Sequence, residues 1–179
     1  MRLQDMSGDP AQQLERAYEE HADGLFRYGV FKLSDREQAE DLLQETFVRA
    51  WKYVSSNEAV GNFKAFLYKI MSNLIIDEYR KRKPIDSLDA MGDADGFDPP
   101  FDDTERWFDA IDGERAVALI ARVPPPYSEA VFMRYVQELT LREISEITGE
   151  RENTVAVHIH RGLDRLRTLY FEKHHDPHP

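Results

Sequence analysis

The amino-acid sequence predicts an all-α protein in which two small helical domains are joined by a flexible acidic linker. In residues 1–83, glycine and proline are sparse and apolar side chains recur at intervals of three and four. Residues 84–113 lack this period and are rich in aspartate, which is typical of a segment that does not fold alone. The helical period returns in residues 114–172, and residues 173–179 are expected to form a disordered tail.

The first helix is expected to span about residues 10–33. The motif Ser34-Asp-Arg-Glu37 then predicts a capping box, in which the Ser34 hydroxyl accepts the amide proton of Glu37 and begins the second helix. The side chains of the first helix that we expect to be buried include Leu14, Ala17, Leu25 and Phe26.

The second helix is expected to run to about residue 54 and to have two different faces. The simplest interpretation of its polar face, which contains Asp41, Gln44 and Glu45, is exposure to solvent. The apolar stripe that we expect to face the core consists of Ala39, Leu42, Leu43, Phe47, Ala50, Trp51 and Val54.

The third helix is expected to span residues 63–82, with Asn62 as its N-cap and Pro84 beyond its end. Residues 64–83 carry a net charge of +4, although the whole chain carries −11. The simplest interpretation of this basic end is a solvated helix terminus, where cations interact favourably with the helix dipole. The expected core contacts of this helix are Phe66, Leu67, Ile70, Leu74 and Ile75.

Most of the acidic excess lies in residues 84–115, whose net charge is −9. Proteins that bind DNA on their own usually present a net basic face. This chain instead combines a short basic patch with a strongly acidic segment. Aromatic residues within the segment indicate that it docks on a partner: Phe97, Phe101, Trp107 and Phe108.

After the linker, a short helix is expected at residues 116–123, and three prolines separate it from the next helix. Thr140-Leu-Arg-Glu143 predicts a second capping box, and Gly149 supplies a left-handed turn before a longer helix. Two helices joined in this way form the helix-turn-helix pattern, and an ordinary helical hairpin is the alternative. The expected inward residues are Leu141, Ile144, Ile147, Val155, Ile159, Leu163 and Leu166.

In a helix-turn-helix, the start of the second helix enters the major groove of DNA. Asn153 and Thr154 are therefore candidates for reading base edges, whereas Arg161 and Arg165 are candidates for holding phosphate or guanine. Val157 is expected to point outward, where its side chain would contact a thymine methyl group.

The stretch VPPPYSEAVFMRYVQELTLREISEITGERENTVAVHIHRGLDRLR resembles region 4 of a bacterial RNA polymerase sigma factor. AEDLLQETFVRAW, residues 39–51, is similar to region 2.2 of that family, and FKAFLYKIMSNLIIDEYRKRK, residues 63–83, resembles regions 2.3 and 2.4. With regions 2 and 4 alone, the chain resembles the extracytoplasmic-function (ECF) group of the sigma-70 family. The resemblance implies a transcription initiation factor that binds the RNA polymerase core, recognises the −10 and −35 promoter elements, and promotes DNA melting.

The resemblance also implies roles for individual residues. Relatives often have lysine-serine-arginine where this chain has Ala156-Val157-His158. This difference leaves open which −35 sequence the chain reads, but not its role in reading a −35 element. The implied contacts with the polymerase core are Asp41, Gln44 and Glu45. Those with −10 DNA are Asn62, Lys69, Asn73, Arg80, Lys81 and Arg82, and those with −35 DNA are Arg151, Asn153, Thr154, Val157, His158, Arg161 and Arg165.

The family resemblance further implies an anti-sigma factor as a partner. Two alternatives stay open: a sigma-like mimic that sequesters an anti-sigma factor, and a stand-alone helix-turn-helix regulator. The sequence contains no cysteine and no recognisable catalytic motif, so we expect no enzyme activity, cofactor or metal site. Its polar N-terminus and its lack of a long apolar window predict a cytoplasmic protein without membrane insertion.

Overall fold

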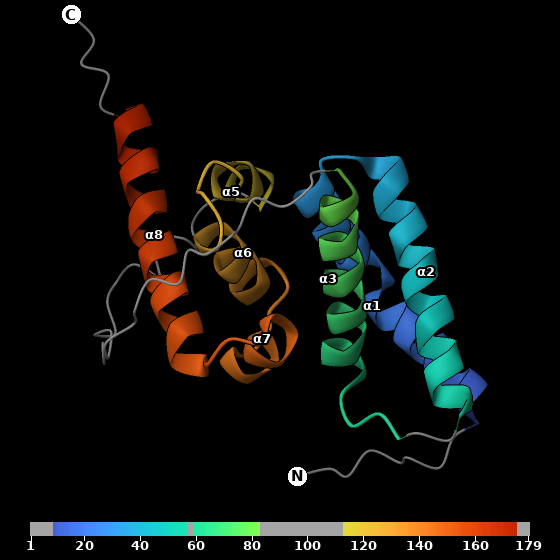
Figure 1. The fold of residues 1–179 in the computed structure, drawn as a ribbon. Coiled ribbons are helices and arrows are strands. Elements are labelled where there is room, and N and C mark those ends of the chain that lie inside the picture. The colour runs from blue at the N-terminus through green and yellow to red at the C-terminus, as the bar shows by residue number, and fades with distance from the viewer. Residues whose placement is uncertain (1–8, 57–58, 83–112, 175–179) are drawn as a thin grey trace, which may run out of the picture. The chain divides into compact units, whose positions relative to one another are not determined.

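The computed structural model describes residues 9–56, 59–82 and 113–174, and the regular structure within them is helical (Figure 1). The chain divides into two compact units, Met1–Asp89 and Ala90–Pro179. The all-α prediction is confirmed, and the predicted linker lies outside the described residues apart from Gly113. The first unit contains α1 (Pro10–Leu33), α2 (Arg36–Ser55) and α3 (Phe63–Arg82); the second contains α5 (Gly113–Ile120), α6 (Tyr127–Val131), a π-helical turn (Phe132–Val136), α7 (Leu141–Thr148) and α8 (Glu152–His174).

The first unit is a three-helix bundle in which α1, α2 and α3 all pack against one another. Gly29 permits the close approach of these helices, because a Cβ atom there would lie 2.6 Å from the terminal methyl of Met71 and 3.1 Å from the Cβ of Ala39. The Thr46 hydroxyl is buried and donates to the Leu42 carbonyl at 2.7 Å, as a buried polar group must. The largest fully buried side chains of this core are Leu25, Tyr28, Leu67, Tyr68, Met71 and Ile75.

The capping box predicted at Ser34 is wrong. Ser34 instead ends α1 in the left-handed conformation, with φ at 54°, and its amide donates to the Val30 carbonyl. Because an N-cap residue needs an extended backbone, the role passes to Asp35, whose carboxylate accepts from the Gln38 amide at 3.1 Å.

Trp51 was expected in the core, but 44% of its surface is exposed. Ala50, its neighbour, is fully buried and occupies the inward position, and consecutive residues on a helix are separated by about 100°. Leu43 and Phe47 are buried as predicted. Other residues expected inside are only half-buried: Leu14, Phe26, Leu42, Phe66, Ile70 and Leu141.

The second unit contains the predicted helix-turn-helix. Thr140 forms the expected capping box with Glu143, and Gly149 ends α7 in the left-handed conformation at a φ of 79°. The short helix expected at residues 116–123 is shifted to Gly113–Ile120, ahead of the three prolines. Helix α8 continues to His174, past the boundary predicted at residue 172, and residues 175–179 lie outside the described part of the chain.

Candidate protein and nucleic-acid interfaces

The polar face of α2 is exposed as expected, and it also carries apolar side chains. Asp41 and Gln44 are exposed, and Arg49 Nε donates to Glu45 Oε1 at 2.8 Å. This hydrogen bond holds the pKa of the Glu45 carboxyl below its ordinary value. Val48, 46% exposed, follows at the same helical spacing, so periodicity was a signal that could have found it. The face therefore offers both negative charge and apolar surface to a partner.

Each cation at the end of α3 has an acidic neighbour in the preceding turn. Arg80 lies 3.6 Å from Asp77, and Lys81 lies 3.4 Å from a carboxylate oxygen of Glu78. Arg82 Nε lies 3.7 Å from the other oxygen of the same carboxylate. The three basic side chains are solvent-exposed, and ion pairs at such positions contribute little stability. They can therefore exchange their carboxylate partners for DNA phosphates at small cost.

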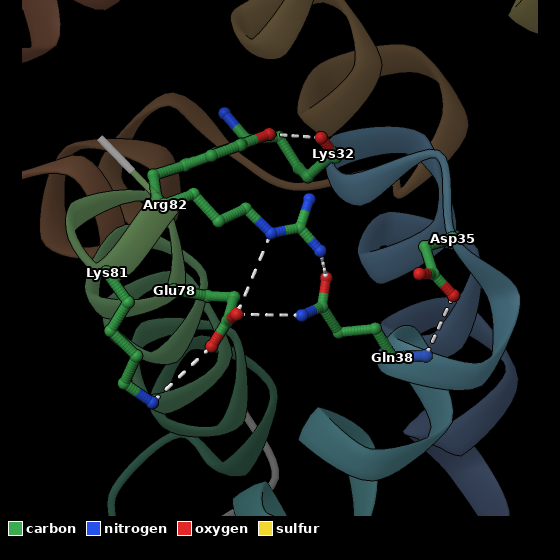
Figure 2. A network of polar contacts seen from close by, with 7 residues as sticks. Lys32, Asp35, Gln38, Glu78, Lys81 and Arg82 are labelled. Atoms are coloured by element: carbon green, nitrogen blue, oxygen red, sulfur yellow. Dashed lines mark hydrogen bonds and ion pairs between the residues drawn. The ribbon is translucent and has the colours of Figure 1, made fainter.

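The end of α3 is also tied to the junction between α1 and α2, as Figure 2 shows. The Gln38 amide nitrogen donates to Glu78 Oε1 at 2.8 Å, and the Arg82 guanidinium donates to the Gln38 amide oxygen. The Tyr79 hydroxyl donates to the Lys32 carbonyl. Gln38 and Glu78 were not predicted from the sequence, because they lie forty residues apart and no local pattern links them.

The other residues predicted to contact −10 DNA divide into two groups. The Asn62 side chain accepts from the Ala65 amide at 3.0 Å, which confirms its predicted role as the N-cap of α3. Lys69, Asn73 and Arg80 follow one side of α3 at helical spacing, and Asn73 is exposed. Ile76 lies on the same side and is 43% exposed. This side of α3 thus combines polar, basic and apolar groups.

In the helix-turn-helix, the start of α8 is accessible. Arg151 and Asn153 are exposed before and within its first turn, Thr154 is half-buried, and Arg161 is exposed two turns later. Val157 was expected to point outward, but only 5% of its surface is exposed, so that prediction is wrong. Helix α8 packs against α5, α6 and α7, so more side chains are buried along it than one stripe would supply (Figure 1).

His158 and Arg165 are brought together on one aromatic ring. The Arg165 guanidinium lies 4.0 Å from the centroid of the Tyr127 ring, and His158 meets the same ring edge-on at 5.5 Å. His158 Nδ1 also lies 3.2 Å from a carboxylate oxygen of Glu150. Tyr127 was not predicted as a site residue, because it belongs to a different helix from its two partners.

Two further features are absent from the described residues. No group of three or more His, Asp or Glu side chains there is arranged to hold a metal ion. Within the same part of the chain, no helix is both long and apolar enough to cross a membrane.

The first unit presents an exposed charged face on α2, and a helix-turn-helix unit follows it along the chain. This combination is typical of helical proteins that act on DNA. Residues 17–85 match Sigma-70 region 2, and residues 114–166 match Sigma-70, region 4. The chain is 32% identical to the ECF RNA polymerase sigma factor SigW of Bacillus subtilis, over 82% of this chain and 83% of that protein. It is 31% identical to the ECF RNA polymerase sigma factor SigE of Mycolicibacterium smegmatis, over 95% of this chain and 66% of that protein.

The fold is similar to that of the sigma factor RpoE in complex with the anti-sigma factor NepR from Bartonella quintana. The TM-score is 0.66 at 21% identity, and the match covers 89% of this chain and 97% of that chain. This chain belongs to the sigma-70 family of RNA polymerase sigma factors, in the ECF group. It is a transcription initiation factor that directs RNA polymerase to promoters.

Proposed function

We propose that the polar face of α2 docks this chain on the RNA polymerase core through Asp41, Gln44 and Glu45. The exposed carboxylates suit a basic partner surface, and the exposed Val48 beside them supplies apolar contact area. The Glu45 carboxylate accepts a hydrogen bond from Arg49 on the same face and would exchange it for a cation of the partner. The chemistry of RNA synthesis belongs to the core, so the role requires no catalytic group in this chain.

In this proposal, α3 engages the −10 element and promotes melting. Arg80, Lys81 and Arg82 exchange their acidic neighbours for phosphates of the promoter strand. The side of α3 that contains Lys69, Asn73 and the exposed Ile76 receives unstacked bases. Asn62 acts by capping α3, which fixes the start of this surface.

The −35 element is read by the first turns of α8. Arg151, Asn153 and Thr154 lie at the start of α8, which is the part of the helix that enters the major groove. Arg161 follows on the exposed side. The burial of Val157 removes it from the set of base-reading residues and assigns it to packing. His158 is held by Tyr127 and Glu150, so we assign it a role in shaping the surface.

We further propose that an anti-sigma factor regulates this protein in the cytoplasm. The RpoE structure that shares this fold is a complex with an anti-sigma factor, which supports a partner of the same kind here. An anti-sigma factor that covers α2 and α8 would block both core docking and promoter recognition.

This proposal rests on the order of the two sigma regions in the chain. The first has an exposed polar face on α2, and the second contains the helix-turn-helix. The test mixes the chain with bacterial core polymerase and a pool of genomic upstream fragments, and then measures promoter opening by fluorescence. Opening and specific initiation should require both proteins. Specific binding by the chain alone would favour a stand-alone regulator. Core binding without opening of any fragment would favour a mimic that sequesters an anti-sigma factor.

A further inference from the structure

We propose that Tyr127 is a positioning residue for promoter binding, because its ring holds the Arg165 guanidinium ready to contact a DNA phosphate. The inference rests on the proposed function, since it concerns the same −35 surface. It adds a residue from α6 to a surface that the sequence placed at and within α8.

The contacts around Tyr127 form one continuous cluster. The Arg165 guanidinium lies 4.0 Å from the ring centroid, which is close enough for a favourable interaction between the cation and the ring. His158 meets the ring at 5.5 Å with the two planes at 84°, and a carboxylate oxygen of Glu150 lies 3.2 Å from Nδ1 of that imidazole. The ring is therefore held from one side by His158, and Arg165 rests on a fixed platform.

Gly162 explains how α6 comes so close to α8. A Cβ atom at this position would lie 2.4 Å from a methyl group of Val131 and 3.0 Å from the Tyr127 carbonyl oxygen. His158 and Arg165 are seven residues apart, about 10.5 Å along the helix, and Gly162 lies between them. The first residue of α6 therefore lies against α8 at this level, and its ring reaches both side chains.

The position of Arg165 favours a phosphate as its ligand. It lies thirteen residues after Glu152, about 20 Å from the start of α8, whereas the major groove is about 12 Å wide. Its exposed guanidinium is thus placed to reach the DNA backbone beyond the bases that Asn153 contacts. Phosphate contacts set the register of a protein on DNA, so a fixed arginine would align the whole recognition helix.

Holding Arg165 in place before binding should increase affinity. A free arginine side chain loses conformational freedom when it is immobilised on a phosphate, and a side chain already stacked on a ring loses less. The planar guanidinium can stack on the ring and still direct its N–H groups at a phosphate from its edge. Lysine at this position would keep the charge but lose the planar stacking.

The experiment uses the full chain bound to core polymerase and an upstream fragment that wild-type protein has opened. Its affinity for the fragment is measured between low and moderate salt for Tyr127→Leu, Tyr127→Phe, Arg165→Met and the double variant Tyr127→Leu/Arg165→Met. We expect Tyr127→Leu to weaken binding about threefold, and Tyr127→Phe, which keeps the ring, to bind like wild type. Arg165→Met should weaken binding about tenfold and reduce the salt slope by about 0.9, since one phosphate contact is lost.

The double variant decides whether Tyr127 acts through Arg165. We expect it to bind no more weakly than Arg165→Met alone. If Tyr127→Leu weakens binding equally in both backgrounds, or has no effect on binding, the proposal is overturned. A purely structural role would lower the unfolding temperature and leave the affinity of the folded protein unchanged.

Arg165→Lys provides a test that does not depend on how well the Tyr127 variants fold. It should keep the salt slope of wild type and still lose affinity, because the charge remains and the stacking does not. Full affinity in Arg165→Lys would contradict the proposal. If wild type and core together open no fragment, the proposed function itself fails, which is a different outcome from any of these.

Discussion

Gly162 shows how strongly one residue constrains the packing of the second unit. A Cβ atom there would overlap a methyl group of Val131, which is fully buried. We predict that Gly162→Ala destabilises this unit by about 1–3 kcal/mol, the usual cost of overpacking a core. Thermal unfolding followed by circular dichroism measures the change.

Gly113→Ala is the matched control, because it lies at the start of α5 and a Cβ atom there meets nothing within 4 Å. It should be neutral or slightly stabilising, since alanine is the better helix former. Equal destabilisation by the two substitutions would mean that the contact with Val131 is not the cause.

Glu45 carries a second prediction at this scale. Its pKa is lowered first by the hydrogen bond from Arg49, and the charge of Lys52 is the smallest contribution. Arg49→Met should therefore raise the pKa of Glu45 towards its ordinary value, and Lys52→Met should raise it less. Side-chain carboxyl NMR during a pH titration measures both pKa values. A larger rise in Lys52→Met would contradict the assignment of Arg49 as the main partner.

At the scale of helices, local motifs were decisive in some places and insufficient in others. Ser34 and Thr140 begin motifs of the same form, yet only Thr140 makes a capping box. Thr140 has a loop before it and is free to adopt the extended conformation of an N-cap. Ser34 directly follows α1 and is used to end it, so Asp35 caps the next helix. The sequence motif describes the helix that follows and carries no information about the helix before it.

Helical periodicity predicted the main buried stripes and failed where packing involves more than one neighbour. Val157 lies off the stripe of α8 that begins at Val155, yet α8 contacts three other helices and Val157 is buried. Trp51 shows the reverse error: it was expected to be buried and is exposed, because the small Ala50 occupies the inward position beside it. The contacts of Tyr127 and Gln38 could not be predicted, since their partners lie on other helices.

The polar network between α2 and α3 leads to a prediction about DNA affinity. Glu78 faces both Lys81 and Arg82, and its charge would repel DNA phosphates at this surface. Glu78→Gln keeps the shape and an oxygen that can accept from Gln38, so the helices should stay tied. We expect the variant to bind a short duplex about threefold more tightly at low salt, with the gain lost at high salt. Fluorescence anisotropy across a salt series measures the difference.

Glu15→Gln is the control for this prediction, because it makes the same change in net charge at an exposed site. Glu15 precedes Lys32 by seventeen residues on α1, about 25 Å along the helix, whereas Glu78 lies within 4 Å of both Lys81 and Arg82. Glu15→Gln should therefore increase the affinity for the duplex much less than Glu78→Gln does. Equal gains in the two variants would show that net charge alone, and not the position of Glu78, sets the affinity.

At the scale of the whole molecule, the charge of −11 becomes compatible with DNA binding once its distribution is considered. The three cations at the end of α3 share two carboxylates, Asp77 and Glu78, which offset part of the positive charge there in the free protein. A promoter offers phosphates that can replace those carboxylates, but the gain for each exposed pair is small. Tight binding therefore needs additional contacts, which the polymerase core supplies in the proposed complex.

The two units each have their own buried core, so we expect the free protein to unfold in two separate transitions. Gly29→Ala and Gly162→Ala provide the test, since each places a Cβ atom against a neighbour within one unit only. Differential scanning calorimetry should show that Gly29→Ala lowers only the transition of the first unit and Gly162→Ala only that of the second. If both substitutions lower one common transition, the units are thermodynamically coupled in the free protein. In that case, docking of α2 on the polymerase would also change the stability of the helix-turn-helix.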